Sequence, residues 1–165
     1  MISQSSEYAL RAVVYLAQNG DGPAVASDIA AATKVPLGYL HKILRILVRH
    51  RILVAQRGAG GGFALAKVPS AISVLDILRA TDTLIDRIEQ CPLGIPGHTT
   101  LCALHHMLDE AVAETARRFS GTSVADLIQP SGRVTPLCEV NAPVSVSTSA
   151  RSRSSSPSAS KRKRT

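Results

Sequence analysis

A glycine-rich segment between two strand-like runs constrains the fold of this 165-residue chain more than any other feature. Residues 58–62 contain four glycines and lie between the apolar runs 52–57 and 63–67. Two short strands joined by such a link are expected to pair as a β-hairpin. A phosphate-binding loop of a nucleotide enzyme is excluded, because that loop joins a strand to a helix and continues with Lys and Ser or Thr.

Three helices are expected before the hairpin, over residues 5–18, 27–33 and 37–50, and Pro36 suits the start of the third. The third helix has one apolar and one basic face. Its apolar residues recur at the spacing of a buried stripe: Leu40, Ile43, Leu44, Leu47 and Val48. The opposite face contains no acidic residue and comprises Gly38, Tyr39, His41, Lys42, Arg45 and Arg49.

A basic helix face is often merely solvated, but the elements expected on either side of this helix favour a role in DNA binding. Two short helices, a polar-faced third helix and a Gly-rich hairpin predict a mainly α fold with a small β-hairpin wing, the winged helix-turn-helix. The major groove of DNA admits an α-helix whose polar face reads base edges. In the wing, Gly60 and Gly61 let the backbone approach phosphates closely, and Arg57 places a charge beside them.

The distribution of charge points to the same partner, double-stranded DNA. The chain carries a formal net charge of +7, yet residues 29–75 contain seven Lys or Arg and not one acid. Residues 76–130 hold four basic and eight acidic residues. An acid-free basic stretch of this length suits a polyanion. No paired acids or nucleophile–base set marks an enzyme.

The second half of the chain predicts a dimer. After a fourth helix, with Ser73 as its N-cap and Asp76 in its first turn, a Pro- and Gly-rich loop over residues 91–100 leads into a long helix over 101–120. Apolar residues of that helix alternate three and four apart, the seam spacing of a coiled coil. We therefore expect a homodimer on a two-fold symmetric operator. The seam comprises Leu101, Leu104, Leu108, Ala111, Thr115 and Phe119.

Three regions are expected: a DNA-binding domain over residues 1–80, a cysteine-containing sensor loop and dimerisation helix over 81–130, and a disordered basic tail over 131–165. The cluster Lys161-Arg-Lys-Arg164 either adds non-specific attraction to DNA or is a solvated end with no role. Because the sequence shows neither a signal-like start nor a membrane-length apolar run, we expect a cytoplasmic protein with no membrane contact.

Five motifs occur in a characteristic order: Glu7-Tyr-Ala-Leu10, Val35-Pro-Leu-Gly-Tyr-Leu40, Arg57-Gly-Ala-Gly-Gly-Gly-Phe63, the cysteine loop, and Thr122-Ser-Val-Ala-Asp-Leu127. Together they resemble the BadM/Rrf-type family of transcriptional regulators, which includes IscR and NsrR, over residues 1 to 130. The resemblance implies that the start of the third helix contacts bases and that the wing arginine enters the minor groove. The matching positions are Gly38, Tyr39, His41, Lys42 and Arg57.

The resemblance also implies a sensory site. Members that bind a cluster place three cysteines in the loop, whereas others use fewer cysteines, a histidine and an acid from the first helix of the partner subunit. Here the middle cysteine is absent, and Gly97 or His98 stands near its place. The remaining donors could hold an iron–sulfur cluster such as [2Fe-2S], where mixed Cys and His ligation occurs. They are Cys91, Cys102, His105 and Glu7.

Other interpretations of these residues stay open. The position of Cys102 in the first turn of the long helix favours a thiolate, which suits a thiol or disulfide switch as well as a cluster. Both cysteines could also be small buried hydrophobes with no bound effector, and His98 or His106 could replace His105. An alternative function is a small iron–sulfur redox protein, which would not need the basic helix. Cys138, in the tail, is assigned no role.

Overall fold

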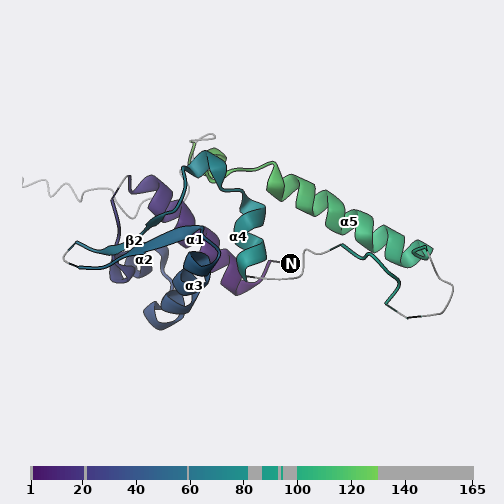
Figure 1. Cartoon of the computed structure of the whole chain (residues 1–165), viewed down its shortest axis with the longest axis horizontal. Helices are drawn as coiled ribbons and strands as arrows, with labels where there is room; N and C mark the ends of the chain where they lie inside the picture. Colours follow the sequence, from purple (N-terminus) through teal and green to yellow (C-terminus); the bar gives the residue numbers. More distant parts are fainter. Residues whose placement is uncertain are drawn as a thin grey trace, which may run out of the picture.

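The computed structural model describes residues 2–20, 22–58, 60–81, 87–92, 94 and 100–129 (Figure 1). Helices α1 (Gln4–Gln18), α2 (Ala26–Thr33) and α3 (Leu37–Arg49) pack around one apolar core. The side chain of Ser3 caps α1 by accepting a hydrogen bond from the backbone N–H of Ser6. Lys34, at φ 57, ends α2 in the left-handed conformation that stops a helix.

The core is built from the apolar stripes that the sequence predicts. In α3 the buried members are Leu40, Ile43, Leu44 and Leu47, and full burial of each such side chain is worth about 1.5–3 kcal/mol. The stripe of α1 lies opposite them, with Ala9, Ala12 and Val13 fully inaccessible. The orientation of α3 is thus set by its apolar face, which leaves the basic face outward.

Strands β1 (Leu53–Gln56) and β2 (Gly62–Leu65) form the expected antiparallel hairpin, with Gln56 opposite Gly62. In the turn, the Gly61 N–H donates to the Gly58 carbonyl at 2.9 Å, and the φ of Gly58, 100°, requires glycine. Phe63 also pairs with Ala24, which attaches the hairpin to the α1–α2 connection. Mainly helical with a two-stranded wing, the chain has a winged helix-turn-helix fold.

The remaining elements are the 3-10 turn η1 (Pro69–Ala71), α4 (Val74–Thr81), α5 (Ala103–Ser120) and α6 (Val124–Ile128). The expected N-cap of α4 is present, since the Asp76 N–H donates to Ser73 Oγ and the Ser73 N–H donates to Asp76 Oδ2. After α5 the chain returns to the first domain, where Val124 is completely buried.

Helix α5 contacts α4 and projects away from the domain that contains α1, α2 and α3 (Figure 1). It begins at Ala103 and not at residue 101. Cys102 is consequently the N-cap, in an extended conformation with ψ 164, which corrects its expected placement inside the first turn. None of the helices in the described part of the chain is long and apolar enough to span a membrane.

Candidate nucleic-acid interface and cysteine site

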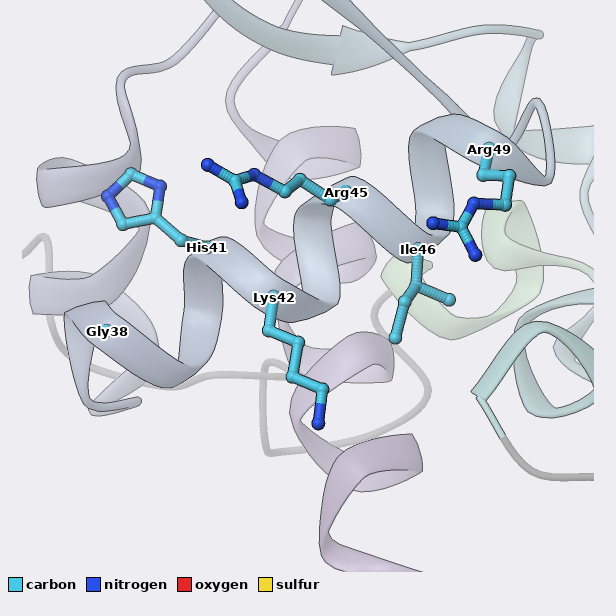
Figure 2. A pocket seen from close by; sticks show the side chains of 6 residues that line it. All are labelled: Gly38, His41, Lys42, Arg45, Ile46 and Arg49. Atoms are coloured by element: carbon cyan, nitrogen blue, oxygen red, sulfur yellow. The ribbon is translucent and has the colours of Figure 1, made fainter.

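The outward face of α3 presents a row of basic side chains along a shallow hollow (Figure 2). All four of these side chains are exposed, and none takes part in an ion pair within the described residues. Gly38, at the start of the row, has open space where a Cβ would stand. The charges are therefore available to a polyanion. The row comprises His41, Lys42, Arg45 and Arg49, and Ile46 lies between the last two.

Tyr39 occupies a different position from the rest of the predicted DNA-binding residues. Its hydroxyl is 2.6 Å from Ser5 Oγ, and its ring meets the ring of Tyr8 edge-on at a centroid distance of 5.8 Å. The side chain thus fastens the start of α3 to the start of α1, while 38% of the residue stays exposed. A base contact by Tyr39 remains a prediction, and the structure gives this residue a positioning role that sequence alone did not reveal.

In the wing, Arg57 and Gly60 are exposed beside the turn. Gly61 has a structural reason to be glycine, because a Cβ there would lie 2.5 Å from the backbone oxygen of Gln56. This requirement of the turn is independent of DNA, and a close approach of Gly61 to DNA stays a prediction.

Sequence reasoning missed a second basic hollow at the base of the wing. It is lined by exposed basic side chains and one acid, with buried Ile52 and Ile72 between them. His50, Arg51 and Lys67 belong to the acid-free stretch, which was the available signal, but nothing in the sequence placed them beside α4. The charged and titratable members are His50, Arg51, Lys67, Asp76 and Arg79.

Residues 87–91 are attached to α5 through the carboxylate of Asp109. Arg87 Nε donates to Asp109 Oδ1 at 2.6 Å, its Nη2 donates to Oδ2, and the backbone N–H of Ile88 donates to Oδ1 at 2.9 Å. These bonds lower the pKa of Asp109 from 3.8 to about 2, and the bond from the Arg87 side chain has the largest effect. Burial of the carboxylate acts in the opposite direction and raises the pKa. The carboxylate is therefore ionised at any physiological pH.

His105 lies between the two loop cysteines. Its Nδ1 is 3.3 Å from Cys102 Sγ and 3.6 Å from Cys91 Sγ. Cys91 is buried and Cys102 exposed, and both are free thiols. The structure thus brings together three of the four predicted ligands, which come from two separate segments.

Residues 2–130 of the chain match the Rrf2 family, described as iron-dependent transcriptional regulators. The chain belongs to the Rrf2 family. It is thus a DNA-binding transcriptional regulator and not an enzyme. The family resemblance and the winged fold expected from sequence are confirmed.

Relatives and solved structures agree with this assignment. The chain is 36% identical to the HTH-type transcriptional regulator BadM of Rhodopseudomonas palustris over 138 residues, which covers 81% of this chain and 86% of BadM. CymR of B. subtilis, the global cysteine regulator, superposes with a TM-score of 0.65 at 26% identity, over 77% of this chain and 95% of CymR. IscR of T. potens has the same fold, with a TM-score of 0.64 at 23% identity over 77% and 85% of the two chains.

The donors of this Rrf2 regulator suit iron in kind, since thiolates and imidazole are ligands of iron–sulfur clusters. A thiolate and an imidazole bound to one tetrahedral metal ion are about 3.6 Å apart, and both sulfur–nitrogen separations are close to that value. As the side chains stand, however, no group of three or more His, Cys, Asp or Glu in the described residues is arranged to hold a metal ion. Each sulfur–nitrogen distance thus suits two ligands of one metal ion, but the residues of a single chain do not form a complete set of ligands.

The fourth predicted ligand does not join this group. Glu7 lies in the first turn of α1 and pairs with Arg11, and α1 belongs to the domain from which α5 projects (Figure 1). A contribution from Glu7 would therefore have to come from a second copy of the chain. His106 pairs instead with Glu110 at 3.5 Å. His98 and Cys138 lie outside the described residues.

Proposed function

We propose that this Rrf2 regulator binds a two-fold symmetric operator as a homodimer, and that chemistry at its loop cysteines changes its operator affinity. The observation that carries the DNA-binding part is the outward basic face of α3. Lys42 and Arg45 are exposed there, and neither is paired with an acid in the described part of the chain. A helix of this kind can enter the major groove, with Arg57 of the wing beside it.

The dimer is supported by the surface of α5. Leu104, Met107 and Leu108 are 58%, 57% and 42% exposed, while Asp109 is the buried residue of the helix. Leu104 and Leu108 each come directly before a residue that contacts the segment 87–91. Neighbouring positions of an α-helix are about 100° apart around its axis. One face of α5 therefore holds residues 87–91, and the neighbouring face is left apolar for a second copy.

The proposed sensor is assembled next to this dimer face. Cys91, Cys102 and His105 would hold an iron–sulfur cluster, with Glu7 of the second copy as the fourth ligand. When bound, a cluster supplies a centre whose oxidation or loss responds to redox conditions. The chain's part is to place two sulfurs beside His105, on the helix that meets the partner. A change in this site would thus alter the spacing of the two α3 helices.

A thiol switch is a second mode for the same residues. Both cysteines are free thiols, and both sulfurs lie within hydrogen-bonding distance of His105 Nδ1. Oxidation by hydrogen peroxide would convert one thiol to a sulfenic acid with release of water, and attack by the second thiol would then form the disulfide and release a second water.

Two measurements test the proposal separately. Mobility shifts with a fragment of the gene's own promoter should show sequence-dependent binding, and absence of any preference over random DNA contradicts the operator proposal. Anaerobic reconstitution with iron and sulfide should give visible absorbance and about one cluster per subunit. Cys91→Ala or Cys102→Ala should abolish that absorbance, Glu7→Ala or His105→Ala should weaken it, and Cys138→Ala serves as the matched control.

A colourless protein after reconstitution, with operator affinity indifferent to both loop cysteines, would exclude the sensor and leave the DNA-binding proposal intact. A colourless protein whose affinity falls on peroxide treatment, and recovers with a thiol reductant, would select the thiol switch.

A further inference from the structure

We infer that Asp109 is the positioning residue of the cysteine site: it holds residues 87–91 on α5 so that Cys91 stands at His105. This inference rests on the proposed role of Cys91 and adds to it a residue that contacts no cysteine. The observation behind it is the three hydrogen bonds that converge on one carboxylate, two from Arg87 and one from the Ile88 N–H.

The contact specifies a position, and not only proximity. An arginine that binds a carboxylate through two parallel N–H groups fixes distance and orientation together. The Ile88 N–H adds a backbone anchor, so the chain itself is held and not merely a flexible side chain. The carboxylate is nearly covered, with 8% of its side chain exposed, whereas the side chain of Arg87 is 59% exposed. Burial of an ionised carboxylate is costly unless its oxygens accept hydrogen bonds, and both oxygens of Asp109 do so.

The geometry of the chain carries this anchor to Cys91. From Ile88 to Cys91 is three residues, which span at most about 10 Å when extended. Along α5, Asp109 and His105 are one turn apart, about 6 Å. A segment anchored at Asp109 and running back along α5 therefore reaches His105 at Cys91, and the observed separation of 3.6 Å agrees.

Burial distinguishes the two cysteines in a way that can be measured. Cys91 is 9% exposed in the anchored segment, whereas Cys102 is exposed at the N-cap of α5. Alkylation of Cys91 must await local opening of the segment, while Cys102 is accessible throughout. The ratio of the two rates, read in one molecule, therefore reports how often the segment opens, and urea unfolding of each variant shows whether that opening is local or global.

The test is the rate of iodoacetamide modification at each cysteine of the metal-free full-length protein, located by peptide mass spectrometry. In the wild type, Cys91 should react about tenfold more slowly than Cys102. In Asp109→Asn the Cys91 rate should rise about tenfold, with the Cys102 rate within about twofold of wild type. Glu110→Gln, which removes the adjacent and exposed carboxylate of the same helix, should change neither rate.

Arg87→Gln provides the second variant, because this exposed side chain can be changed without opening the core. It should raise the Cys91 rate as Asp109→Asn does, and Arg87→Lys should give an intermediate rate. Unchanged Cys91 rates in both Asp109→Asn and Arg87→Gln would overturn the inference, as would an equal rise at both cysteines. These rates are measured on metal-free protein and do not depend on whether a cluster can be reconstituted. Failure to reconstitute a cluster would therefore contradict the proposed sensor and leave this test of Asp109 unaffected.

Discussion

Replacement of Arg45 by Gln is the sharpest test of the DNA interface. The side chain is exposed on α3, and within the described residues it joins no ion pair. Its loss should therefore change the free energy of unfolding by less than about 0.5 kcal/mol. Any loss of DNA affinity can then be attributed to the contact with DNA and not to unfolding.

The expected magnitude follows from counterion release. Each phosphate contact on B-DNA contributes about 0.9 to the slope of log K against log salt concentration. A homodimer presents Arg45 twice, so the variant should flatten the slope by about 1.8, whereas a monomer would lose about 0.9. Between 50 and 200 mM salt, a change of 1.8 makes the affinity ratio of wild type to variant shrink about tenfold. The size of the change thus counts the copies of α3 on the DNA.

Fluorescence anisotropy with a labelled promoter duplex, at four or more salt concentrations, measures this slope. Arg117→Gln is the matched control, because Arg117 is an exposed arginine near the end of α5 and lies outside both basic hollows. If Arg45 contacts a base, the variant should also lose about 1–3 kcal/mol of discrimination at one position of each half-site. Wild-type affinity and slope in a folded Arg45→Gln protein would refute the assignment of this face.

Three further predictions concern other parts of the chain. Leu108→Glu should give monomers or aggregates in sedimentation and abolish binding to two-fold sites, since the charge enters an apolar dimer face; an intact dimer would count against α5 as the interface. The pKa of Asp109 is about 2, below the usual 3.8, because of the bonds from Arg87 and Ile88, with a smaller contribution from His106. The anchor at Asp109 should therefore stabilise the fold fully above about pH 4 and lose its contribution as pH falls toward 2. Asp109→Asn should lack that part of the acid-induced loss in urea unfolding, and parallel wild-type and variant profiles would contradict the assignment. Truncation after Gln129 removes seven basic residues and one acid, so binding should weaken on all sequences and the salt slope should flatten; a changed operator preference would show that the tail reads sequence.

The outward basic face of α3 and the core were largely predictable because their signals are local. The stripe from Leu40 to Leu47 repeats with the period of an α-helix, so burial of one face leaves Lys42 and Arg45 on the other. Four glycines within five residues favour a tight link whatever the chain does elsewhere. The cysteine site was predictable in its membership only through family resemblance, since spacing alone relates Cys102 to His105 but says nothing of Cys91.

Tertiary structure alone decided which distant residues meet. The pairing of Arg87 with Asp109 spans 22 positions, and that of Ser5 with Tyr39 spans 34. No periodic pattern encodes such pairs, because they depend on the path of the chain between them and on which charged group can reach a given carboxylate. The helix boundary at Cys102 is of the same kind: no side chain caps the α5 N-terminus, so residue preferences there left the start of the helix undetermined. The sequence by itself therefore determined the elements and the basic face that we propose meets DNA. Packing over long sequence separations determined where Cys91 stands and which residue holds it there.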